Sequence, residues 1–168
     1  MFHQAISKMF VYGTLRPDDT SGAPWTHPFN NPQGYQVHAQ FGYIEKAQLF
    51  FHKYPIAILN DNPNDRIYGY IISVSEPEGE NFEKLLKFAD EIEEYPEEYD
   101  RAIVEAYPIS KTEYDDNNMQ QTVHKPPIQS QSPPIPCFVY HRTLQNIAIR
   151  DSNPQLQPIP SGDWLLRK

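Results

Sequence analysis

The sequence predicts an α+β fold: a small, mixed and mostly antiparallel β-barrel with one main helix and long loops. Segments with the composition of strands outnumber the one convincing helical segment. Connections between segments are short apart from two long loops, and several of the 17 prolines fall in the later of these. A closed or nearly closed sheet with one or two helices packed on it accommodates this order of elements.

Length and composition predict the class of protein. The 168 residues are enough for one domain, 1–168, to bury a core without metal or disulfide support. The one cysteine, Cys137, excludes an intramolecular disulfide and favours a reducing compartment. A net charge of −8 disfavours nucleic acid as a partner. We find no membrane-spanning run or signal peptide, and expect a cytoplasmic protein. The oligomeric state stays open.

The first half of the chain reads as strands. Lys8–Arg16 (KMFVYGTLR) predicts a strand that runs into a turn at its glycine. Gln36–Phe51 shows strand-like alternation in places. Tyr54–Asn60 and Arg66–Val74 are apolar strands on either side of the turn residues Asp61–Asp65. We expect an antiparallel hairpin across that turn.

The second half holds the main helix, which apolar spacing predicts at about Gly79–Glu93. A strand at Arg101–Ile109 and another at Cys137–Arg142 flank a polar, proline-rich loop at about 110–136. We expect the C-terminal segment from Asp151 onward to close the fold and to pack the Trp164 side chain against the body of the protein.

An acidic run, Asp90–Asp100, holds seven carboxylates in eleven residues. Most of such a run forms a solvated face. At about 100° per residue, however, Glu93 shares the stripe of Leu86 and Ala89 and should point toward the barrel. Burial there would raise its pKa and suit it to proton transfer near neutral pH. The alternative is a helix that frays at Ile92 and leaves Glu93 in water.

The second candidate is the turn of Tyr12, Gly13, Thr14 and Leu15. A glycine turn at a strand end can aim backbone N–H groups at an anion. The alternative is an ordinary turn. Other chemistry has little support, because the six histidines lack metal-ligand spacing and Cys137 sits in an apolar strand. No phosphate-binding or nucleophile motif is present. We therefore expect no metal and no cofactor.

Together these segments resemble the gamma-glutamylcyclotransferase-like family. Phe10–Pro17 (FVYGTLRP) resembles its first signature, and Ala89–Arg101 resembles its second, an Asp, a Glu three residues later, a Tyr and an Arg. In this chain those are Asp90, Glu93, Tyr99 and Arg101, and Glu94 stands where the family often has glycine. Further resemblances are Tyr54–Ala57, Phe138–Tyr140 and Ser161–Trp164.

The resemblance implies a barrel enzyme that releases 5-oxoproline from a small gamma-glutamyl substrate without a cofactor. By position, Glu93 would be the general acid and base. The Tyr12–Leu15 backbone would hold the glutamyl group and the oxyanion. Tyr54, Pro55, Tyr99 and Tyr140 would line the substrate site. The leaving group stays open.

Two other readings remain. The first is a non-catalytic barrel of the same fold that binds a small molecule or a protein. The second is an interaction segment at Ser132–Pro136, whose prolines favour polyproline II geometry, although a spacer loop explains them as well.

Overall fold

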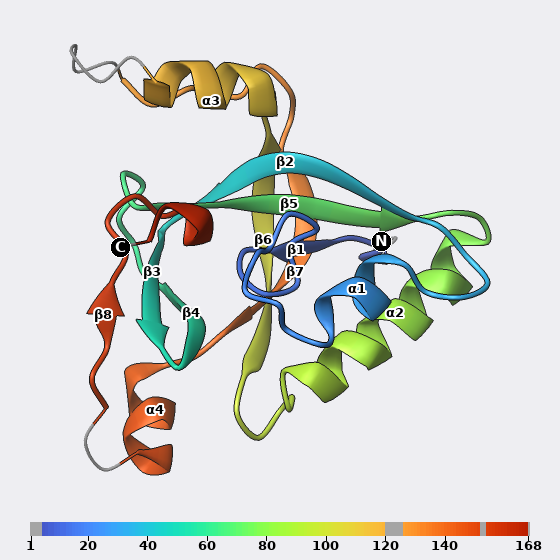
Figure 1. Ribbon diagram of the computed structural model, residues 1–168, viewed down its shortest axis with the longest axis horizontal. Helices are drawn as coiled ribbons and strands as arrows, with labels where there is room; N and C mark the ends of the chain where they lie inside the picture. Colours follow the sequence, from blue (N-terminus) through green and yellow to red (C-terminus); the bar gives the residue numbers. More distant parts are fainter. Residues whose placement is uncertain (1–4, 120–125, 152–153, 168) are drawn as a thin grey trace.

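A closed barrel of five strands forms the centre of the computed structural model, which describes residues 5–119, 126–151 and 154–167 (Figure 1). β1 and β7 pair in parallel, and every other pair in the barrel is antiparallel. The predicted mixed, mostly antiparallel barrel is therefore confirmed. In barrel order the strands are β1 (Met9–Val11), β5 (Arg66–Val74), β2 (Val37–Glu45), β6 (Asp100–Pro108) and β7 (Ile135–His141).

β1 is buried on both faces, which explains why its sequence is apolar without alternation. Met9 and Val11 pack in one cluster with Leu85 of the main helix. Phe10, between them, points to the other face and joins the cluster that contains Trp164. The strand thus connects two cores, and the chain leaves it directly into the Tyr12–Leu15 turn.

The expected hairpin between Tyr54–Asn60 and Arg66–Val74 is wrong. β4 (Tyr54–Leu59) pairs with β3 (Ala47–His52), and β8 (Gln157–Pro158) completes this second, three-stranded sheet. The reason is local. Lys53 adopts a left-handed conformation (φ 63°) and reverses the chain in one residue, so β4 pairs with the preceding strand. The turn at 61–65 instead carries the chain from this sheet back to the barrel.

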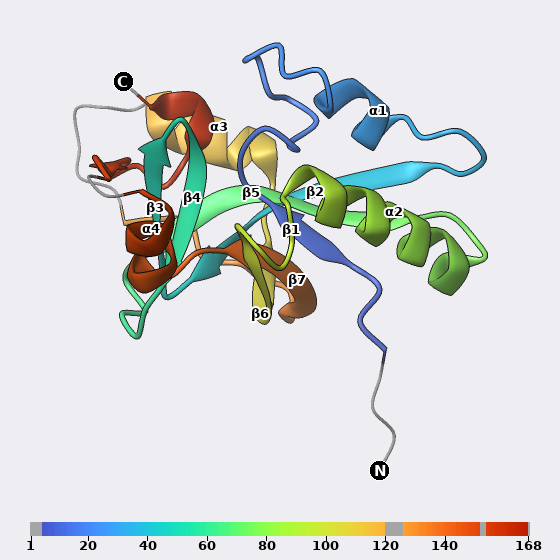
Figure 2. The ribbon, with the colours of Figure 1, turned by 90° about the horizontal axis from the view of Figure 1, so that it is seen from below.

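The main helix, α2 (Glu78–Ile92), lies where the sequence predicts it. Phe82, Leu85 and Ala89 are buried along one face, against the barrel. A short helix, α1 (Thr26–Asn30), lies beside α2 in both views (Figures 1 and 2) and buries Phe29 completely. This side of the molecule carries the end of α2 and the turn after β1.

The proline-rich segment 110–136 is not loop throughout. It begins with a helix, α3 (Lys111–Met119), which the prediction missed. Ser110 caps the helix by accepting a hydrogen bond from the Glu113 N–H at 3.2 Å, and Tyr114 is buried. Residues 126–134, including most of the proposed interaction segment, are irregular, and residues 120–125 lie outside the described part of the chain.

The C-terminal part closes the fold as predicted, since Trp164 is only 2% exposed. It contains α4 (Leu144–Arg150), β8 and a 3₁₀ turn at Trp164–Leu166. Asp163 accepts a 2.8 Å hydrogen bond from Arg16, and both side chains are buried. Within the described residues, no helix is long and apolar enough to cross a membrane.

Candidate active site

A small cavity of about 20 Å³ lies where the end of β1 meets the end of α2. It brings together residues from four elements that are far apart in the chain. Its walls are Phe10, Val11, Tyr12, Gly13, Thr14, Leu15, Pro55, Glu93 and Tyr140. Seven of these nine belong to the set of site residues predicted from the sequence.

Glu93 is the C-terminal cap of α2, and its N–H donates a helical hydrogen bond to the Ala89 carbonyl at 2.9 Å. The helix therefore does not fray before it. As a whole the residue is partly exposed, and it forms part of the cavity wall. Burial, and secondarily the charge of Glu98, raises the pKa of Glu93 to about 8. Such a group exchanges a proton readily near neutral pH.

The helix ends immediately after Glu93. Glu94 adopts a left-handed conformation (φ 51°), the position after the cap where glycine is usual. The chain then turns and continues into β6. This conformation explains why glycine is typical at this position. Glu94 adopts it as well, at some cost in backbone strain.

The turn after β1 lines the cavity with Tyr12, Gly13, Thr14 and Leu15. The Arg16 N–H donates to the Gly13 carbonyl at 2.9 Å. No described residue accepts from the N–H groups of Gly13, Thr14 or Leu15. The Trp25 indole donates to Thr14 Oγ1 at 3.0 Å and holds the turn against α1. The turn thus offers fixed, unpaired donors, which is what an anionic oxygen requires.

Gly13 is needed for a close approach. A Cβ built on Gly13 would lie 2.1 Å from Cγ of Pro55 in β4. Any side chain at this position would push β4 away from the turn. Pro55 therefore forms one wall of the cavity, and glycine is what lets it do so.

The hydroxyl groups of Tyr12 and Tyr99 point into structural hydrogen bonds. Tyr12 donates to the Tyr140 carbonyl at 2.7 Å and accepts from the Ala57 N–H at 3.2 Å. Tyr99 donates to the Pro55 carbonyl at 2.8 Å. Burial raises the pKa of both tyrosines. These two hydroxyls position β4 and β7 around the cavity.

Tyr140 differs from the other two tyrosines because its hydroxyl pairs with an acid. It donates to Asp90 Oδ1 at 2.7 Å. Arg101 holds the same carboxylate with its Nη1, at 2.7 Å from Oδ1 and 2.6 Å from Oδ2. Asp90 lies on α2 one turn before Glu93, so the helix carries both carboxylates to the same side of the barrel.

Comparison with known proteins identifies the family of the chain. The family described as gamma-glutamyl cyclotransferase, AIG2-like, matches residues 9–166. The chain belongs to this AIG2-like family. Among curated proteins, none matches the chain in sequence.

Solved structures of similar proteins share the AIG2-like fold. An AIG2-like protein from Mus musculus is 19% identical, with 83% of this chain and 78% of that one covered at a TM-score of 0.52. The uncharacterized protein LOC79017 from Homo sapiens is 15% identical, with 91% and 71% covered at a TM-score of 0.50. At these identities the likeness concerns the fold alone.

Two residues predicted at the substrate site of this AIG2-like protein do not line the cavity. Tyr54 is 51% exposed, and its ring lies 6.2 Å from that of Trp25. Tyr99 lies behind the wall and supports Pro55. Sequence reasoning missed Phe10 and Val11 as wall residues. Asp90 stood in the motif without a role, and its place one helical turn before Glu93 was the signal that could have given it one.

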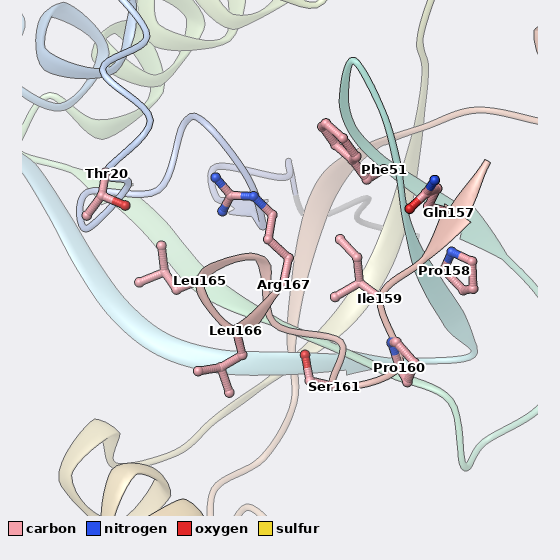
Figure 3. Close-up of a pocket in the computed structure, with 10 residues that line it drawn as sticks. All are labelled: Thr20, Phe51, Gln157, Pro158, Ile159, Pro160, Ser161, Leu165, Leu166 and Arg167. Atoms are coloured by element: carbon pink, nitrogen blue, oxygen red, sulfur yellow. The ribbon is translucent and has the colours of Figure 1, made fainter. Parts of the chain in front are cut away.

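A larger cavity in the AIG2-like fold, about 730 Å³, lies between the C-terminal segment and β3 (Figure 3). Among the described residues, Arg167 has the one ionisable side chain that lines it. A permanently charged guanidinium cannot exchange protons at neutral pH. Acid–base chemistry therefore points to the smaller cavity with Glu93.

Cys137 is buried and does not belong to the residues that line the cavity of the AIG2-like site. Burial raises the pKa of the Cys137 thiol to about 12, so it stays protonated and unreactive. Within the described residues, no group of three or more His, Cys, Asp or Glu side chains could hold a metal ion.

Proposed function

We propose that this protein is a gamma-glutamyl cyclotransferase that uses Glu93 as general acid and base and releases 5-oxoproline. The observation that carries the proposal is the shared cavity. Glu93, whose carboxyl group has a pKa of about 8, lines it together with the turn whose N–H groups at Gly13, Thr14 and Leu15 are unpaired among the described residues. Family membership over residues 9–166 supports the same reaction class.

The proposed reaction is an intramolecular acyl transfer. Glu93 removes a proton from the substrate α-ammonium group, and the nitrogen forms a bond to the γ-carbonyl carbon. The carbonyl oxygen becomes an oxyanion, which the N–H groups of Gly13, Thr14 and Leu15 stabilise. The oxyanion then reforms the carbonyl as the C–N bond to the leaving amine breaks, and Glu93 gives its proton to that nitrogen. The ring nitrogen then gives its second proton to the Glu93 carboxylate, which passes it to the released amine, so that 5-oxoproline and an alkylammonium ion leave.

Energetics favour this use of Glu93. The substrate α-ammonium group stands beside its own α-carboxylate and is therefore a weaker acid than a chain-terminal α-ammonium group, whose pKa is about 7.7–8.0. A Glu93 carboxylate with a pKa of about 8 accepts its proton far more readily than an ordinary carboxylate would. Because the ring closure is intramolecular, orientation can contribute roughly 7–11 kcal/mol. A proton shuttle adds about 10²–10⁴-fold in rate.

Substrate entry requires the cavity to widen. A space of about 20 Å³ holds about one water molecule. A gamma-glutamyl group is much larger, so the walls must part. Pro55 in β4 is the wall formed by the second sheet, and we infer that it moves away from Gly13 when substrate binds.

The first prediction is that Glu93→Gln abolishes release of 5-oxoproline while the protein stays folded. The amide keeps the shape of the side chain but cannot accept the proton, so kcat should fall at least about 100-fold. The measurement is 5-oxoproline release from a panel of gamma-glutamyl amino acids, gamma-glutamyl amines and glutathione. Circular dichroism checks the fold.

Glu91→Gln is the matched control, because Glu91 lies two residues earlier on the exposed side of the same helix. Its activity should match the wild type. Activity of Glu93→Gln on every substrate that the wild type turns over would exclude the role of Glu93. Binding of gamma-glutamyl compounds by the wild type without any turnover would instead favour the non-catalytic barrel.

A further inference from the structure

The hydrogen bonds around Tyr140 determine which way its hydroxyl proton points. A carboxylate can only accept hydrogen bonds, and a hydroxyl has one proton to give. Since Asp90 Oδ1 lies 2.7 Å from the Tyr140 hydroxyl, that proton is directed at Asp90. Burial, followed by the hydrogen bond to Asp90, raises the pKa of Tyr140, so the hydroxyl keeps its proton.

Arg101 keeps Asp90 in this role. Its Nη1 contacts both carboxylate oxygens, and its guanidinium carbon lies 4.3 Å from the Tyr95 ring centroid and 5.0 Å from that of Phe138. The guanidinium is thus held by aromatic contacts as well as by the ion pair. A paired, charged Asp90 cannot become a donor to Tyr140.

Tyr140 lines the cavity, and its hydroxyl, which donates to Asp90, is left with acceptor capacity alone. Its remaining lone pair can take a hydrogen bond only from a donor group on a ligand. The cavity then has two kinds of surface. The turn at Gly13–Leu15 supplies donors, and Glu93 together with Tyr140 supplies acceptors. A ligand that fits must present an oxygen toward the turn and N–H groups toward Glu93 and Tyr140.

We propose that Asp90, held by Arg101, is a positioning residue that makes the Tyr140 hydroxyl an acceptor for the α-amine nitrogen of a gamma-glutamyl group. This inference rests on the proposed function and assigns an atom of the substrate to Tyr140. After Glu93 takes one proton, Tyr140 still accepts from a remaining N–H. The nitrogen lone pair is then turned toward the γ-carbonyl carbon, as ring closure requires.

The test compares two probes that differ only in the α-amino group: L-glutamine, and 4-carbamoylbutanoate, which carries hydrogen at that position. Binding of each is measured by calorimetric titration at pH 8, so the result does not depend on turnover. The wild type should bind L-glutamine more tightly. In Tyr140→Phe that preference should fall about 10-fold, because a hydrogen bond to a charged group is lost. Affinity for 4-carbamoylbutanoate should change less than twofold.

Asp90→Asn tests the positioning role. An amide can donate to Tyr140 as well as accept from it, so the hydroxyl is no longer held as an acceptor. The preference for L-glutamine should fall, whereas a purely structural effect would weaken both probes equally. Tyr43→Phe is the matched control, since Tyr43 is buried and its hydroxyl is hydrogen-bonded in a separate cluster. It should keep the wild-type preference.

An unchanged preference in Tyr140→Phe, or equal weakening of both probes, overturns this inference and leaves the proposed function standing. Failure of the wild type to bind either probe overturns the proposed function, and this inference with it.

Discussion

Glu93 is a carboxyl group held where its charge is disfavoured, and this determines how the protein should respond to pH. The carboxyl must be ionised to accept a proton, and its pKa is about 8. We therefore predict that kcat/KM rises about tenfold per pH unit below pH 8 and levels off above it. Initial rates of 5-oxoproline release from pH 5.5 to 9.5 measure this. A profile already flat at pH 6 would show an ordinary carboxyl group.

The same pKa predicts a cost in stability. An unfolded Glu ionises near 4.5, whereas the folded residue stays protonated up to about 8. The folded state thus binds the extra proton between these values, and stability falls as pH rises through that window. Glu93→Gln removes this penalty. It should stabilise the protein at pH 9 by on the order of 4 kcal/mol relative to wild type, and hardly at all at pH 4.

Urea unfolding of both proteins at pH 4 and pH 9 measures the difference. An equal effect at both pH values would mean that packing, rather than ionisation, distinguishes the two side chains. A stabilisation of Glu93→Gln at pH 9 alone is what we expect of a functional residue whose reactivity lowers the stability of the protein.

Helical periodicity alone distinguished Glu93 from its acidic neighbours, because the residues that share its stripe lie within two turns of it. The partner of Asp90 could not be found this way. Tyr140 lies 50 residues later, on a strand whose place beside α2 depends on the closed barrel. Contacts between distant elements leave no period in the sequence.

Among the elements, the turn after β1 depends on the close approach of β4. We predict that Gly13→Ala displaces Pro55, destabilises the protein by about 1–3 kcal/mol and lowers kcat/KM at least tenfold. Chemical denaturation and kinetics measure the two effects. Gly79→Ala is the control, because nothing lies within 4 Å of its Cβ position in α2, and it should be neutral or stabilising. Wild-type kinetics in Gly13→Ala would show that the turn tolerates a wider gap.

Element prediction failed where two local signals competed. The strands of the second sheet were recognised, but Lys53 reverses the chain with no Gly, Asn or Asp to mark the turn, so the pairing was assigned to the wrong neighbour. For α3 a signal existed. Ser110 and Glu113 stand three apart, the spacing of a capping box, and were overlooked among the prolines and glutamines that follow.

At the scale of the molecule, a buried ion pair ties the two ends of the described chain together. Arg16 follows the active-site turn, and Asp163 lies in the C-terminal segment, where it also accepts from Tyr114 of α3 at 2.8 Å. We predict that Asp163→Ala lowers the free energy of unfolding by about 3–5 kcal/mol, because it removes a carboxylate that pairs with the buried Arg16 guanidinium. The free energy of unfolding from urea titration measures this.

Glu80→Ala provides the comparison, since its ion pair with Lys84 is exposed and should contribute less than 1 kcal/mol. A cost for Asp163→Ala as small as that for Glu80→Ala would mean that Asp18, the other partner of Arg16, compensates.

The barrel itself could be predicted because its strands are apolar and numerous. Its order could not, because strand pairing at this range has no local mark. The assignment of 1–168 to a single domain stays a prediction.

Pro55 belongs to the second sheet, whereas Glu93 and the Tyr12–Leu15 turn belong to the barrel and its helix. The wall that we propose to move and the reaction centre that we propose thus belong to separate structural units. We expect relatives to diversify their leaving groups by changing the segment between Lys46 and Asn60 while the reaction centre stays constant. Exchange of that segment between two family members should therefore transfer the preference for the leaving group while the reaction stays the same.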